Sequence, residues 1–169
     1  TNDALTAKTA VATLARAVSL MNEYAAEYNL TDKAWTIYVS GTVSGTAEIS
    51  SVSASSLDII GLSDESADVL DGNGAGTVLS ISAAVPITIR DITICNGSAE
   101  NGGGIYYNAA STLTITDATI DSNTASANGG GIYFAASSGT LVLNGSTVVS
   151  NNTAATDGGG VYNCGTMFM

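Results

Sequence analysis

One six-residue phrase occurs three times in this chain, and its spacing constrains the fold more than any other feature. The copies are Asn101–Tyr106, Asn128–Tyr133 and Asp157–Tyr162, and each has three glycines, then Ile or Val, then Tyr. The first glycines of successive copies lie 27 and 29 residues apart. A helical repeat would show apolar residues at a 3.6-residue period, but here short alternating segments lie between turns. The period therefore predicts a stack of β-coils.

A second set of residues repeats with nearly the same period. Leu113 and Ile115 return as Leu141 and Leu143, 28 residues later. We expect three short strands per coil, each paired in parallel with its equivalent one coil away, at about 4.8 Å per coil. Three interior stacks are predicted: Ile105, Ile132 and Val161; Leu113, Leu141 and Met167, with Ile87 below Leu113; and Ile120 and Val148, 28 residues apart.

The region before the glycine phrases also has the character of strands. Alternating segments at 36–41, 56–61, 77–81 and 86–89 are separated by Gly, Ser, Asn and Asp. The only proline, Pro86, stands at a strand start, where its missing N–H is tolerated. The fold class predicted for 34–169 is all-β, a right-handed parallel β-helix of about five coils in one domain.

The first thirty residues differ in pattern. Apolar side chains recur every three or four positions and form one stripe of a helix over 4–30: Val11, Leu14, Val18, Met21, Ala25 and Tyr28. Asp3 is placed to cap its N-terminus. Since the end of a solenoid exposes core side chains and unpaired backbone, we expect residues 1–33 to be a helical cap on the first coil.

These motifs resemble known families. The Gly-Gly-Gly-Ile/Val-Tyr phrase, then Thr-Leu-x-Ile/Leu, then Ile120–Asn123 or Val148–Asn151, resembles the polymorphic outer-membrane protein repeats of chlamydiae, with Ile or Val where that family has Phe. The capping helix and Asp68–Gly74 resemble the pectin-lyase-like superfamily. The resemblance implies a right-handed β-helix in a bacterial surface-exposed or adhesin region, with extracellular or cell-surface localisation.

The charge balance limits the partners. The net charge is -11, and Arg90 is the only base after residue 33. Nucleic acid and anionic membranes would be repelled, and no apolar run approaches the length of a membrane span. We therefore expect no nucleic acid partner and no membrane insertion.

Residues for catalysis are scarce, and we predict no catalytic residues and no enzymatic activity. The chain has no His, and Arg90 precedes Asp91, which favours a local ion pair. Asp117 and Asp121 could project near each other around a turn, but their expected equivalents in the next coil are Gly145 and Val149. The alternative, a carbohydrate-binding or polysaccharide-degrading β-helix protein, requires an acidic cluster and Arg90 to share a groove.

No cofactor or metal site is predicted. Asp64, Glu65, Asp68 and Asp71 cluster near Gly72 and superficially resemble a calcium loop, but a solvated loop between coils explains them equally well. Cys95 and Cys164 are too few for a disulfide framework and are interpreted as small buried apolar residues.

One outward feature repeats in all three phrases. If Ile105, Ile132 and Val161 point inward, strand alternation turns the neighbouring tyrosines outward, one above another: Tyr106, Tyr133 and Tyr162. This column is either a stack that stiffens the sheet or a ligand-binding strip for a glycan or a host or partner protein. An ice-binding threonine array is less consistent, because Thr114 and Thr116 are followed one coil later by Val142 and Asn144.

The last coil completes the prediction. Met169 falls in the middle of an expected strand with no polar cap after it. We expect either that the chain continues into a longer repeat array or that it associates with itself through this coil. The function expected from sequence is a non-enzymatic surface or secreted module, acting as a structural stalk or an adhesin-like binding region.

Overall fold

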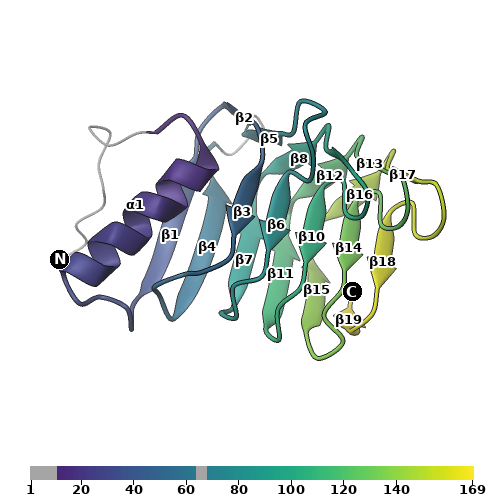
Figure 1. Ribbon diagram of the computed structural model, residues 1–169. Coiled ribbons are helices and arrows are strands. Elements are labelled where there is room, and N and C mark those ends of the chain that lie inside the picture. The colour runs from purple at the N-terminus through teal and green to yellow at the C-terminus, as the bar shows by residue number, and fades with distance from the viewer. Residues whose placement is uncertain (1–10, 64–67) are drawn as a thin grey trace.

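A computed structural model of the protein describes residues 11–63 and 68–169. The chain winds into a parallel β-solenoid of about five coils, with one helix at its N-terminal end (Figure 1). Each coil contributes one strand to each of three main sheets, so the predicted fold class is confirmed.

Every strand pairs in parallel with a strand one coil away. Sheet 1 consists of β1 (Ala34–Val39), β4 (Ser56–Gly61), β7 (Ile87–Arg90), β11 (Thr112–Thr116), β15 (Thr140–Asn144) and β19 (Thr166–Phe168). Sheet 2 consists of β2 (Thr42–Ser44), β5 (Val69–Asp71), β8 (Thr93–Cys95), β12 (Thr119–Asp121) and β16 (Val148–Ser150). Sheet 3 consists of β3 (Ala47–Ile49), β6 (Leu79–Ile81), β10 (Ile105–Tyr107), β14 (Ile132–Phe134) and β18 (Val161–Asn163).

A fourth, narrow sheet joins sheets 2 and 3 in the later coils. It consists of the two-residue strands β9 (Ser98–Ala99), β13 (Thr124–Ala125) and β17 (Thr153–Ala154). The sequence analysis predicted three strands per coil and did not anticipate this sheet. Two residues are too few to show an alternating pattern, which is the signal from which strands are predicted.

The predicted interior stacks of sheets 1 and 3 are confirmed by the register. Ile87, Leu113, Leu141 and Met167 are paired in succession. Ile105, Ile132 and Val161 are paired in the same way. Together with the other inward-facing side chains they form one continuous hydrophobic core along the solenoid.

The predicted partner of Ile120 was wrong by one residue. Ile120 pairs with Val149, and the side chain of Val148 is 48% exposed. Three residues separate β15 from β16, whereas two separate β11 from β12, so the extra residue shifts the next strand by one position. Because strand side chains alternate, this slip turns Val148 outward.

The N-terminal helix is shorter than predicted. Helix α1 covers Leu14–Glu27, and Thr13 caps it by accepting a hydrogen bond from the Arg16 amide at 3.2 Å. Asp3, predicted as the cap, and residues 4–10 lie outside the described residues. Val11 precedes the helix, and Tyr28, at its C-cap, is exposed rather than part of the buried stripe.

The predicted capping role of the helix is confirmed. The buried helix residues Leu14, Val18 and Met21 belong to the solenoid core, and α1 lies across the first coil (Figure 1). Asn22 fixes the helix to the loop after β3, because its side chain accepts from the Ser53 amide at 2.7 Å and donates to the Ser51 carbonyl at 3.0 Å.

Candidate functional site

The glycine phrase forms a corner between sheet 4 and sheet 3. The first glycine of each copy, for example Gly129 with φ +63°, has a left-handed conformation that strongly favours glycine. The second and third glycines touch the next coil. A Cβ on Gly130 would lie 2.4 Å from the Thr153 carbonyl oxygen, and one on Gly131 would lie 2.6 Å from the Gly160 carbonyl oxygen.

This corner directs the residues that follow it. Ile105 and Ile132 are fully buried, whereas the next residues, Tyr106 and Tyr133, are partly exposed. The third residue of each strand turns inward again, so Tyr107 and Phe134 stack inside the core with ring centroids 4.7 Å apart. The predicted phase of these strands is therefore correct.

The structure places the three predicted strip residues in one column on sheet 3. Tyr106, Tyr133 and Tyr162 are paired in register. Their ring centroids are 5.5 Å and 5.1 Å apart, with interplanar angles of 14° and 7°. We call these three residues the tyrosine column.

The close parallel packing of the column limits what it can bind. Rings lying side by side in one plane could not approach this closely, so they are offset-stacked and cover part of each other's faces. Partial burial, then the neighbouring Cys164, Tyr162 and Tyr106, raise the pKa of Tyr133. At neutral pH the Tyr133 hydroxyl is therefore protonated and able to donate a hydrogen bond.

A second column, of asparagines, was missed by the sequence analysis. Asn123 is fully buried at the corner after β12. Its side chain accepts from the Gly97 amide at 2.9 Å and donates to the carbonyls of Ile94 at 3.1 Å and Asp121 at 3.0 Å.

Asn152 holds the same position one coil later. Its Oδ1 accepts from the backbone amide and the side chain of Asn123, at 2.9 Å and 3.0 Å, and its Nδ2 donates to the Ile120 carbonyl at 2.8 Å. Each asparagine therefore satisfies backbone groups of two coils at the corner. The signal was the spacing from Ile120 to Asn123, which recurs from Val149 to Asn152 once the register is correct.

The acidic residues considered for catalysis have structural partners. Asp117 accepts from the Ser146 amide at 2.8 Å. Asp121 accepts from the side chains of Ser122, Ser150 and Asn151 at 2.6, 2.7 and 2.7 Å, and these bonds lower its pKa. Its equivalent in the next coil is Ser150, not Val149 as predicted. Both carboxylates therefore connect adjacent coils.

Arg90 forms the local ion pair that was predicted. Its guanidinium lies 3.7 Å from the Asp91 carboxylate, and both side chains are about half exposed. The arrangement that would favour a polysaccharide-degrading enzyme, a groove shared by Arg90 and an acidic cluster, is not found within 11–63 and 68–169.

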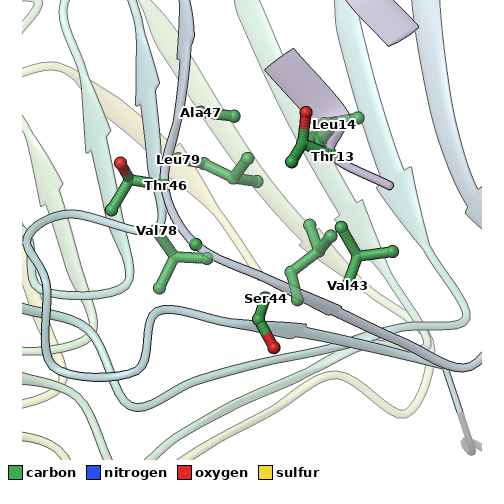
Figure 2. A pocket seen from close by; sticks show the side chains of 10 residues that line it. Thr13, Leu14, Val43, Ser44, Thr46, Ala47, Val78 and Leu79 are labelled. Atoms are coloured by element: carbon green, nitrogen blue, oxygen red, sulfur yellow. The ribbon is translucent and has the colours of Figure 1, made fainter. Parts of the chain in front are cut away.

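One small pocket lies between the start of α1 and the corners of the early coils (Figure 2). Its lining is apolar or hydroxylic: Thr13, Leu14, Val43, Ser44, Gly45, Thr46, Ala47, Leu70, Val78 and Leu79. These side chains include no general acid or base, so the pocket offers no catalytic chemistry.

The region considered for calcium contains a buried carboxylate. Asp64 and Glu65 lie outside the described residues. Asp68 is 1% exposed and accepts from the Gly41 amide at 2.6 Å, the Ser63 amide at 2.7 Å and the Ser63 hydroxyl at 2.6 Å. Burial alone would raise its pKa, but the hydrogen bonds outweigh burial and lower it. This carboxylate thus connects the first two coils.

The interpretation of both cysteines as buried was wrong. Cys164 is exposed and Cys95 is partly exposed, and both are free thiols. Burial, together with the nearby Asp71 and Asp121, raises the pKa of Cys95. Its thiol therefore remains protonated at neutral pH.

Comparisons with known proteins agree with the repeat. Residues 117–135 and 146–164 match the family model of the Chlamydia polymorphic membrane protein repeat. Each match begins near the corner before β12 or β16 and extends through the glycine phrase into β14 or β18. No curated protein and no solved structure matches the chain, and none of the helices in its described part is long and apolar enough to cross a membrane. These two segments, which contain the asparagine and tyrosine columns, are similar to the polymorphic membrane protein repeat, in a chain folded as a parallel β-solenoid.

Proposed function

We propose that this chain is a non-enzymatic structural module of a bacterial cell surface, serving as a rigid spacer. The observation that supports this most is the uninterrupted register of sheet 1 from β1 to β19, in which each coil supports the next. The similarity of two segments to the polymorphic membrane protein repeat supports the surface location.

The packing explains how such a module resists bending. The side chains of Ile59, Ile89 and Ile115 lie in register inside sheet 1 and are fully buried. Close-packed interiors have low compressibility. Bending the axis would compress this ladder on one side and open the strand hydrogen bonds on the other.

Surface display is tested on intact cells of the organism that encodes the chain. An antibody raised against the folded chain should label unpermeabilised cells, and external protease should remove the label. Labelling only after permeabilisation would overturn the surface location. An antibody to a cytoplasmic protein is the control for cell integrity.

The tyrosine column supports a second role, as an adhesin-like contact site for a glycan or a partner protein. Tyr106, Tyr133 and Tyr162 form a regular outward column, and the flanking Cys164 is also exposed. Tyrosine combines apolar area with a hydroxyl donor and has little side-chain freedom to lose on binding.

This second role is tested by replacing all three tyrosines with serine. The matched control replaces Thr112, Thr140 and Thr166 with alanine, since these residues form an in-register outward ladder on sheet 1. Binding to a glycan array and to host cells should be lost in the tyrosine variant and kept in the threonine variant. Unchanged binding by a folded tyrosine variant would rule out the column as the contact site.

Self-association through the last coil stays a prediction. Phe168 is 59% exposed, and Val161 and Met167 are only partly buried although their equivalents Ile132 and Leu141 are fully buried. We expect sedimentation equilibrium at high concentration to show dimers, and Phe168→Ser to weaken them. A strictly monomeric chain would contradict this prediction.

A further inference from the structure

Five Asn-Gly pairs lie at corners or strand ends of the solenoid. In such a pair, the backbone nitrogen of the glycine attacks the side-chain carbonyl carbon of the asparagine, and glycine offers the least steric hindrance. The pairs are Asn73-Gly74, Asn96-Gly97, Asn101-Gly102, Asn128-Gly129 and Asn144-Gly145. Their structural settings divide them into two classes.

In four pairs, the glycine amide donates a hydrogen bond to an adjacent coil. The acceptors are the Asn96 carbonyl for Gly74 at 2.8 Å, the Asn123 Oδ1 for Gly97 at 2.9 Å, the Asn128 carbonyl for Gly102 at 3.1 Å and the Asp157 carbonyl for Gly129 at 3.0 Å. The nitrogen is thus held toward another coil. It must lose this bond before it can attack its own asparagine.

The fifth pair is different. Within the described part of the chain, the Gly145 amide has no hydrogen-bond acceptor and the Asn144 side chain has no hydrogen-bond partner. Both residues are exposed. We propose that Asn144 is a selective modification site, at which the folded protein deamidates spontaneously while the other four Asn-Gly pairs are protected by the coil-to-coil hydrogen bonds.

The chemistry needs only water and a base. The Gly145 nitrogen gives its proton to solvent base and forms a bond to Cγ of Asn144, and the side-chain nitrogen takes up a proton and leaves as ammonia. The five-membered succinimide that results is opened by one water at either carbonyl. The products are aspartate or its β-linked isomer, with no oxidation or reduction.

Either product changes the corner after β15. A carboxylate at Asn144 would lie close to Asp117, whose side chain already contacts the Ser146 amide and occupies the space beside Gly145. The β-linked product also adds one atom to the backbone beyond β15. Both changes weaken the seam between the fourth and fifth coils.

The proposal is tested by incubating the folded chain in mildly alkaline buffer and mapping its peptides by mass spectrometry over time. Deamidation at Asn144 should be at least about tenfold faster than at Asn73, Asn96, Asn101 or Asn128, because these require local opening. In guanidinium chloride all five should react at similar rates. The proposal fails if any protected pair matches Asn144 in the folded chain, or if Asn144 is as slow as the others.

Two variants show whether the hydrogen bond is the cause. Asn144→Gln should abolish the fast reaction, since closure of the larger ring is much slower. Asn123→Ala removes the acceptor of the Gly97 amide and should accelerate deamidation of Asn96 but not of Asn101. Circular dichroism checks that Asn123→Ala is folded, and if it is not, the folded and unfolded wild-type rates still decide.

Discussion

The second and third copies of the glycine phrase have nearly the same sequence but different surroundings. A Cβ on Gly130 would lie 2.4 Å from a backbone oxygen of the next coil, whereas the closest atom to a Cβ on the equivalent Gly159 is 3.2 Å away. The same contrast holds inside, where Leu141 is fully buried and its partner Met167 is partly buried. The demand for a residue type at these positions therefore comes from the neighbouring coil more than from the local turn.

The largest difference is expected for alanine at the second glycine. Gly130→Ala would press a methyl group against the Thr153 and Gly159 carbonyl oxygens, and the strand pairing prevents either from moving away. We expect a loss of more than about 4 kcal/mol of unfolding free energy, which is exceptional for one substitution. Gly159→Ala should cost less than about 1 kcal/mol. Urea denaturation followed by circular dichroism measures both, and equal losses would refute the role of the neighbouring coil.

The interior ladder should show a smaller difference. Leu141→Ala removes a fully buried side chain from sheet 1 and should cost about 3 kcal/mol, as transfer and cavity terms add. Met167→Ala removes a partly exposed side chain and should cost about 1 kcal/mol. Thr114→Ala, on the outward face of the same sheet, is the control. If Met167→Ala were as costly as Leu141→Ala, coil position would not determine the cost.

The asparagine column compares a buried member with a partly exposed one. Asn123→Ala would leave the Gly97 amide and the Ile94 carbonyl without partners, at a cost of about 2–3 kcal/mol. Asn152→Ala should cost about 1 kcal/mol, since water reaches this corner. Thermal unfolding measures both. An Asn123→Asp variant that matched wild type would show that the donated hydrogen bonds are dispensable.

The smallest effect concerns the carboxylates that connect coils. Asp68→Asn should cost about 1–2 kcal/mol at pH 7, since a buried charge loses three hydrogen bonds. Asp121→Asn, at a partly exposed site, should cost less than about 1 kcal/mol.

The pH dependence of Asp68 follows from the direction of its shift. Its pKa is lowered in the folded state, so its contribution to stability is present above the unfolded value of about 3.9 and is lost as the pH falls through the folded value. The stability gap between wild type and Asp68→Asn should therefore close in acid. A gap that stayed constant down to pH 2 would contradict this linkage.

Much of the fold could be predicted because the repeat is visible in the residues that face inward. The ladder from Ile87 to Met167 needs no gap within a strand, so its register followed directly from the spacing. The partner of Ile120 could not be found in this way, because the extra residue at 145–147 lies in a corner that carries no periodic signal.

The site was predicted in part for the same reason. Strand alternation was enough to place Tyr106, Tyr133 and Tyr162 in one outward column. It could not show that the rings cover part of each other's faces, because this depends on side-chain rotation. The roles of Asn123 and Asp68 were also hidden, since polar residues common in turns are buried here only because a second coil lies against them.

The unequal lengths of the coils have a consequence for how such a protein presents its surface. Paired residues of sheet 1 lie 26, 28 and again 26 positions apart in the sequence, yet each step advances the axis by the same strand spacing of about 4.8 Å. The height of a side chain along the axis is thus set by the number of turns and not by the number of residues. The solenoid resembles a ruler with fixed graduations, in which a corner can gain an insertion while the tyrosines keep their heights.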